Sequence, residues 1–278
     1  TWEHKKWNIT DFPEFELAIT IDRPELYYDF LQKEWTRFCH DYWKNNFLEH
    51  HTLSQKRVTR IYIGNQFCHN LFPKKKLLFQ VLEKALENNL AVTLAFTYIR
   101  DHLLEEIDEL LQELEVWCQS REKEAGKDQE EIIVNDWAMP ILLQGKPHLK
   151  PVLGVLLNKR RKDVRLPYKH GIGNHVDSLA ENNLNCGFYQ DYLKNTFDIQ
   201  RFEFESCGYK VTIPDGHHSL HLPFFQTNTS QYCTLYAVCR YGDRGKQKLP
   251  ENCLRYCNKK VFLYPKHLKM VGRYNSLF

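Results

Sequence analysis

The chain has 278 residues, of which 42% are hydrophobic and 26% charged, a composition typical of a globular protein and not of a disordered chain. Its net charge of +3 is too small to imply nucleic-acid binding by itself. No apolar run approaches the roughly 18 residues that span a bilayer, and no signal peptide opens the chain, so we expect no membrane insertion.

Short β-rich runs alternate with helical stretches from about residue 14 onward. In chain order, we predict a strand at 15–21, a strand at 60–68, a helix at 73–89, a strand at 91–99, a helix at 101–125, a strand at 132–134, a short helix at 137–144, a strand at 152–157, a helix at 181–196, a strand at 200–205, and short strands over 209–238.

Strands that alternate with helices imply parallel βαβ units. Six or more such units in a chain of this length favour a single α/β domain over residues 1–278, a (β/α)-barrel of the TIM-barrel type, regular or irregular. A doubly wound open sheet is the alternative. Neither GxGxxG nor GxxxxGK[ST] occurs, so a nucleotide-binding form of that alternative lacks its fingerprint.

Cysteines provide the strongest chemical signal. Nine are present, an odd number spread over a long chain, which favours a reducing cytoplasm with some thiols reserved for metal. Four of them, Cys233, Cys239, Cys253 and Cys257, fall within 25 residues, in a segment at about 230–260. Thiolates bind zinc or iron–sulfur clusters, and structural zinc usually shows CxxC pairs, which are absent here. The pattern therefore favours an iron–sulfur cluster over zinc, against the alternative of small buried hydrophobes.

Several segments resemble a known family when they are taken in order. They are IYIGNQFC, EIIVNDWAMPILL, PVLGVLLNKRRKDVR, SLHLPFFQTNTSQYC and NCLRYC, and they span about residues 55–278. The chain is similar to the collagenase-like peptidase family (the "U-thirty-two" group), in the branch of paired ubiquinone-biosynthesis proteins of oxygen-independent hydroxylation. That resemblance implies a barrel-like domain with a four-cysteine [4Fe–4S] site and a related iron–sulfur protein as heterodimer partner.

Carried over residue by residue, the resemblance nominates Cys68, Cys233, Cys253 and Cys257 as cluster ligands. Cys239 has no family counterpart, yet it precedes Cys253 by fourteen residues, a spacing that would suit a cluster ligand as well. The choice between Cys233 and Cys239 as the ligand therefore stays open. We expect the remaining cysteines to be structural: Cys39, Cys118, Cys186 and Cys207.

Polar residues at predicted strand ends are the candidate catalytic set, because a parallel barrel gathers functional residues there. They are Arg100, Asn135, Asp136 and Arg160. The basic run at 158–162 could bind a carboxylate or phosphate, or could be a solvated loop. Asp136 has the alternative role of capping the helix expected at 137. The run GHHSLH offers His217, His218 and His221 as metal ligands, but without an acidic partner in the sequence nearby we expect a surface turn.

The expected function is that of an iron–sulfur protein in oxygen-independent hydroxylation, or a related modification, of a quinone precursor, an RNA base or a peptide. Two alternatives remain: an accessory subunit whose cluster is structural, and a zinc-dependent hydrolase. Protease activity is not expected, because neither His-Glu-x-x-His nor Gly-x-Ser-x-Gly occurs.

Overall fold

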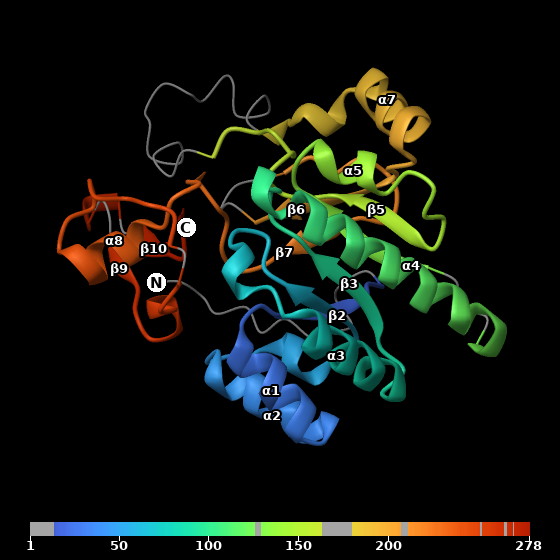
Figure 1. Ribbon diagram of the computed structural model, residues 1–278, viewed down its shortest axis with the longest axis horizontal. Helices are drawn as coiled ribbons and strands as arrows, with labels where there is room; N and C mark the ends of the chain where they lie inside the picture. Colours follow the sequence, from blue (N-terminus) through green and yellow to red (C-terminus); the bar gives the residue numbers. More distant parts are fainter. Residues whose placement is uncertain are drawn as a thin grey trace, which may run out of the picture. The chain divides into compact units, whose positions relative to one another are not determined.

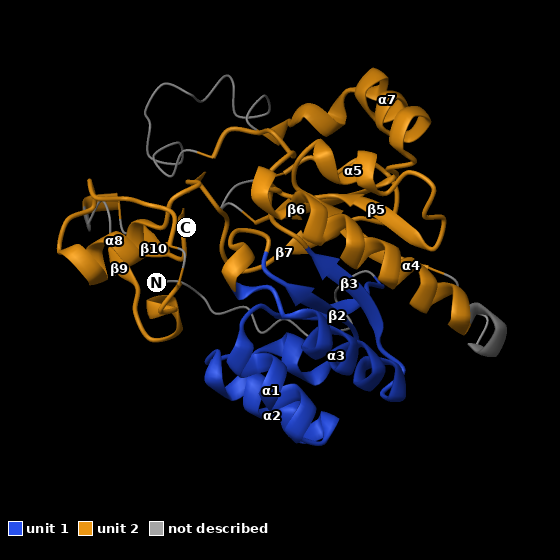
Figure 2. Ribbon diagram, viewed as in Figure 1, with its two compact units in different colours: residues 1–65, 71–95 blue, residues 66–70, 96–278 orange. Residues whose placement is uncertain are grey.

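A computed structural model describes residues 14–125, 129–162, 180–206, 211–250, 252–263, 266–268 and 270–278. The chain divides into two compact units, shown in different colours in Figure 2. Unit 1 comprises residues 1–65 and 71–95, and unit 2 comprises residues 66–70 and 96–278.

Unit 1 contains three parallel strands that neighbour one another in chain order. They are β1 (Leu17–Ile21), β2 (Val58–Gly64) and β3 (Ala91–Ala95). The aliphatic side chains of Ile21, Ile61, Ile63 and Leu94 have no exposed surface, so burial of apolar area holds these strands together.

Three helices accompany these strands: α1 (Pro24–Gln32), α2 (Trp35–Asn45) and α3 (Lys75–Glu87). Helix α3 confirms the helix predicted at 73–89, and it buries Leu78, Val81, Leu82 and Ala85, whose spacing of three and four residues places them on one face. Helices α1 and α2 were not among the predicted elements. Pro24 at the first position of α1 was an available signal, since proline lacks only a hydrogen bond that is unused there.

Unit 2 contains four further parallel strands, again adjacent in chain order: β4 (Glu130–Val134), β5 (Leu149–Leu153), β6 (Arg201–Glu205) and β7 (Ser219–His221). Its helices are α4 (Leu104–Ala125), α5 (Ala138–Leu142) and α7 (Gly187–Phe197), and α4 contacts β5 (Figure 1). The protein is therefore a parallel α/β fold, as the alternation of strands and helices predicted.

The end of unit 2 forms a small separate layer, which we call the C-terminal lobe (residues 228–278). Its antiparallel sheet has the order β8-β11-β10-β9, with β8 at Asn228–Thr229, β9 at Phe262–Leu263, β10 at Val271–Arg273 and β11 at Ser276–Leu277. Helix α8 (Thr234–Tyr241) contacts β10 and the turn at Tyr256–Asn258 (Figure 1).

Two sequence predictions for unit 2 were wrong. Residues 234–238, expected as strand, belong to α8, because Cys233 caps the first turn and Gly242 ends the helix in the left-handed conformation. The helix expected at 181–196 begins only at Gly187, after a short turn at Asn183–Asn185. Among the described residues, no helix is both long and apolar enough to cross a membrane.

Candidate functional site

Strand β6 places charged side chains in a buried position. Its residues alternate, so Arg201, Glu203 and Glu205 share one face and Phe202 and Phe204 the other. All five residues are buried. A buried charge is costly unless it is paired and hydrogen-bonded, so the charged face of β6 requires partners from neighbouring elements.

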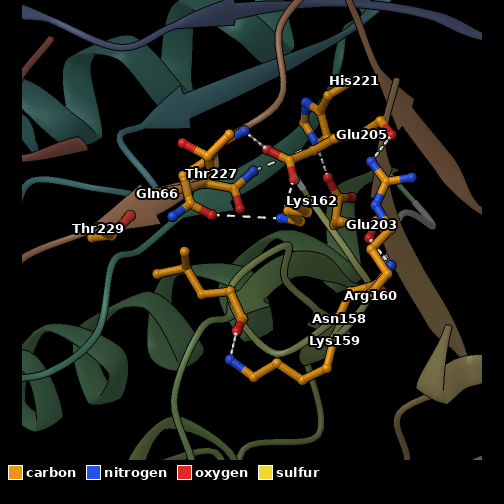
Figure 3. A network of polar contacts seen from close by, with 12 residues as sticks. Gln66, Asn158, Lys159, Arg160, Lys162, Glu203, Glu205, His221, Thr227 and Thr229 are labelled. Carbon is orange, nitrogen blue, oxygen red and sulfur yellow. Dashed lines mark hydrogen bonds and ion pairs between the residues drawn. The ribbon is translucent and has the colours of Figure 1, made fainter. Parts of the chain in front are cut away.

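Those partners form a connected set of side chains that we call the polar network, and Figure 3 labels all of its members except Asn135 and Gln226. It consists of Gln66, Asn135, Asn158, Arg160, Lys162, Glu203, Glu205, His221 and Gln226. Every member lies in unit 2.

Two ion pairs lie at the centre of the polar network. The His221 Nε2 pairs with Glu203 Oε2, and the Lys162 Nζ pairs with Glu205 Oε2. Glu203 has no exposed surface, and Glu205 keeps 4%. Glu205 Oε1 also accepts a hydrogen bond of 2.8 Å from the backbone N–H of Gln226. Both carboxylates are therefore satisfied in a buried environment.

A third ion pair lies further back along β6. Arg201 pairs with Glu131 on β4 and donates a 2.6 Å hydrogen bond to Ser219 Oγ on β7. These side-chain contacts connect β6 with β4 and β7. Arg201 therefore has a structural role, outside the polar network.

Two amides extend the polar network. The Asn135 Nδ2 donates to the Phe96 carbonyl at 2.7 Å and to Gln66 Oε1 at 3.3 Å, while Asn135 Oδ1 accepts from the Leu156 N–H at 3.1 Å. The Gln66 Nε2 in turn lies 3.4 Å from His221 Nε2. Asn135 is 4% exposed, so these bonds hold the loops after β3 and β5 in place.

The loop after β5 contributes a further amide and a guanidinium. The Asn158 Nδ2 donates to the Glu203 carbonyl at 3.0 Å, and the Arg160 Nη2 donates to the Glu205 carbonyl. Arg160 and Lys162 were expected in a basic run that was either a binding loop or a solvated one. The structure draws both side chains against β6, whereas Arg161 is exposed.

The environment shifts the protonation of two members. Burial lowers the pKa of His221, but the charge and hydrogen bond of Glu203, with the charge of Glu205, outweigh it and raise the pKa above 6.5. Burial lowers the pKa of Lys162 from 10.5, and the positive charge of Arg160 adds to that effect against the opposing charge of Glu205. Ionisable groups with shifted pKa values are typical of functional sites.

The position of the polar network fits a functional site of a parallel α/β fold. Glu205 and His221 are the last residues of β6 and β7, and Asn135 directly follows β4. Parallel folds carry their ligand-binding residues at the carboxyl ends of the strands. The buried charges of the polar network, which contribute little to stability by themselves, lie at the carboxyl ends of these strands.

The four cysteines nominated as ligands lie close enough to influence one another. Burial, together with the smaller effects of the charges of Cys233, Cys253 and Cys257, raises the pKa of Cys68 to about 12. Burial also raises the pKa of Cys233 to about 11 and that of Cys257 to about 12, with a contribution from Cys253 in each case. Because Coulomb interactions fall with distance, these mutual effects indicate that the four side chains lie near one another. We call them the four-cysteine group.

Local contacts explain how distant segments meet. Cys68 lies four residues beyond the end of β2, and not at a strand end as expected. Its neighbour Phe67 packs edge-on against Phe278, with 5.1 Å between ring centroids. The Cys233 Sγ donates to the Tyr274 carbonyl at 3.1 Å. The chain terminus thus links the Cys68 loop to the lobe that carries the other cysteines.

Thiolates are the donors that both iron–sulfur clusters and zinc use, so the four-cysteine group fits such a centre by its donor chemistry. Within the described parts of the chain, no group of three or more His, Cys, Asp or Glu side chains is arranged so that it could hold a metal ion. The charge of Cys239, which lies on α8, also raises the pKa of Cys233, by less than that of Cys253 does, so the choice between Cys233 and Cys239 as the ligand stays open.

The remaining cysteines lie in varied settings. Cys118 is buried on α4, Cys39 is half-buried on α2 and Cys186 is exposed before α7. Cys207 lies outside the described residues.

Two members of the predicted catalytic set have other partners. Asp136 accepts bonds from the Ala138 and Met139 N–H groups, both at 3.1 Å, and from the Ile99 N–H, so it caps α5 as the alternative reading had it. Arg100 donates to the Gln231 carbonyl, two residues before Cys233. Burial, and after it the charge of Arg100, lowers the pKa of His69, next to Cys68, to about 4. Arg100 therefore lies beside the four-cysteine group.

Sequence reasoning missed the two buried carboxylates of the site and one of its amides. Glu203, Glu205 and Gln66 were not nominated, and His221 was set aside for want of an acidic neighbour. Its partner Glu203 is 18 residues away in sequence but on the adjacent parallel strand. The available signal was the alternation of charge and phenylalanine in RFEFE. Comparison with protein-family models, with curated proteins and with solved structures gave no match.

Proposed function

We propose that this chain is an iron–sulfur protein that takes part in oxygen-independent hydroxylation, or a related modification, of an organic substrate. The observation that carries the proposal is the four-cysteine group, in which thiols from a loop after β2 and from the C-terminal lobe raise one another's pKa. Sulfur donors without carboxylates are the ligand type of iron–sulfur clusters. Cys68, Cys233, Cys253 and Cys257 would hold the [4Fe–4S] cluster.

The bound cluster would supply electron transfer or activation of an oxygen donor. Hydroxylation balances if an oxygen-atom donor other than O₂ gives one oxygen to a substrate C–H bond and leaves reduced by two electrons. The polar network is the place for that substrate, with His221 and Lys162 able to hold or release protons. Parallel strands adjacent in chain order within each unit support a barrel-type winding in a single domain.

The protein's working context is part of the proposal. We propose a cytoplasmic protein that acts with a related iron–sulfur protein as a heterodimer, because the resemblance in sequence is to a branch of paired proteins. The substrate class stays as wide as a quinone precursor, an RNA base or a peptide.

Anaerobic purification followed by iron, sulfide and zinc analysis tests the proposal. We expect close to four irons and four sulfides per chain, as a [4Fe–4S] cluster requires, and a related four-cysteine protein that co-purifies. Alanine at Cys68, Cys253 or Cys257 should remove most of the iron, while Cys186→Ala, at an exposed cysteine, serves as the matched control. Comparing Cys233→Ala with Cys239→Ala decides which of the two is the ligand.

Other outcomes have distinct meanings. Stoichiometric zinc without sulfide would contradict the iron–sulfur proposal and favour the zinc-dependent hydrolase. A loaded cluster in a protein whose hydroxylated product does not depend on His221 or Lys162 would favour the accessory subunit.

A further inference from the structure

Two buried polar atoms of the polar network have no hydrogen-bond partner among the described residues: Asn158 Oδ1 and Arg160 Nη1. Asn158 is 4% exposed, and its Nδ2 donates to the Glu203 carbonyl, which fixes the amide so that Oδ1 is left as an open acceptor. Buried polar groups are almost always satisfied in native proteins. Two open atoms on one short loop therefore indicate a ligand that bonds to both.

The charges around these atoms specify what the ligand carries. Three cations have carboxylate partners, in the pairs Lys162–Glu205, His221–Glu203 and Arg201–Glu131. Arg160 differs, because its Nη2 reaches only the backbone carbonyl of Glu205. Among the cations of the polar network, as far as the structure describes them, Arg160 is thus the one without a carboxylate partner, and a guanidinium N–H binds carboxylates strongly.

We propose that Asn158 and Arg160 bind an organic monocarboxylate that also carries a hydroxyl group, with the carboxylate on Arg160 Nη1 and the hydroxyl donating to Asn158 Oδ1. A single negative charge balances Arg160. A dianionic phosphate would place an extra negative charge beside Glu203 and Glu205, which is unfavourable in a buried site. This inference rests on the proposed function for the place of the substrate and narrows its class, but it is independent of the cluster, because no cysteine takes part in it.

Binding to the full-length chain, measured by calorimetry and by ligand-observed NMR, tests the inference. The probes are 3-hydroxybutyrate and 3-hydroxybenzoate, with butyrate and benzoate as matched acids that lack the hydroxyl, and inorganic phosphate. We expect each hydroxy acid to bind more tightly than its matched acid. Arg160→Gln should weaken all four carboxylates by roughly tenfold or more, since it removes a charge-assisted hydrogen bond.

Two further variants separate the roles. Asn158→Ala should remove the advantage of the hydroxy acids while leaving butyrate and benzoate nearly unchanged. Arg161→Gln is the matched control, because Arg161 is exposed on the same loop, and its affinities should equal those of the wild type. Iron content should be the same in all three variants, which keeps this test separate from that of the cluster.

The inference is overturned if no hydroxy acid binds the folded wild type, if phosphate binds more tightly than every carboxylate, or if Arg160→Gln and Arg161→Gln weaken binding equally. Should Arg160→Gln fail to fold, Arg160→Lys keeps the charge but loses the planar arrangement of donors. It should then bind carboxylates more weakly than the wild type, and unchanged affinity would equally contradict the assignment.

Discussion

The Glu203–His221 pair controls the charge of a histidine inside the polar network. Glu203 is fully buried and accepts from His221 Nε2, and this contact raises the pKa of His221 although burial alone would lower it. Because the pKa in the folded protein exceeds the unfolded value near 6.5, the pair stabilises the fold fully below that pH. The contribution is lost as the pH rises through the raised pKa.

Replacing Glu203 by Gln should lower the pKa of His221 below 6.5, because the effect of burial then remains without the carboxylate. NMR titration of the imidazole protons measures it, with His221→Asn used for assignment. The stability lost in Glu203→Gln should be largest below pH 6.5 and should shrink as the pH rises. Glu205→Gln is the control and should lower this pKa less, since Glu205 acts by charge alone. Equal pKa values in wild type and Glu203→Gln would contradict the pairing.

Residue-scale prediction from sequence succeeded where the partner is local. Asp136 was correctly read as a possible helix cap, because its partners are two and three residues away. His221 was misjudged, because its acidic partner comes from a neighbouring strand. The cysteines were grouped by resemblance, since nothing in the spacing itself ties Cys68 to residues 233–257.

At the scale of elements, β5 and the loop after it depend on a glycine. A Cβ at Gly154 would overlap Asn135 Oδ1 and would lie 2.7 Å from Ile133 Cγ2. Asn135 would have to move, and its bonds to Phe96 and Leu156 would be lost or lengthened. The close approach of β4 and β5 therefore allows only hydrogen at this position.

Gly154→Ala should destabilise the protein by about 1–3 kcal/mol, as overpacking of a tight interior does. Urea unfolding measures the change in midpoint at constant slope. Gly187→Ala is the matched control, because a Cβ at the start of α7 meets nothing within 4 Å, and the change should be within about 1 kcal/mol of zero or favourable. A Gly154→Ala protein as stable as the wild type would show that Asn135 is not held as described.

Element prediction from the sequence worked best for long periodic segments. The helix expected at 101–125 is α4 preceded by a short turn, and the strand expected at 200–205 is β6. Strand ends were less accurate: the apolar run 91–99 leaves the sheet at Ala95, since the Phe96 carbonyl bonds to Asn135 instead. Apolarity alone does not reveal where a side chain from another element replaces a strand partner.

At the scale of the whole molecule, the four-cysteine group lies entirely within one of the two compact units. All four cysteines belong to unit 2, whereas β1, β2 and β3 belong to unit 1. If the group holds a cluster, metal binding stabilises mainly the part of the chain that provides the ligands.

Removing the proposed cluster by oxidation and chelation should raise amide hydrogen exchange in α8 and around residues 253–258. Exchange in β1, β2 and β3 should change little. Mass spectrometry of peptides from loaded and stripped protein measures both regions in one experiment, so unit 1 serves as the internal control. Uniform loss of protection across both units would show that the metal supports the entire fold rather than one lobe.

The separation of Cys68 from its companions has a consequence for biosynthesis. Cys257 follows Cys68 by 189 residues, so a ribosome adding 5–20 residues per second produces it roughly 10–40 s later. Throughout that interval the Cys68 thiol has emerged without the residues that surround it in the folded protein. Any metal centre that used both thiols could be completed only after translation of the lobe, and until then the Cys68 thiol would have to stay reduced.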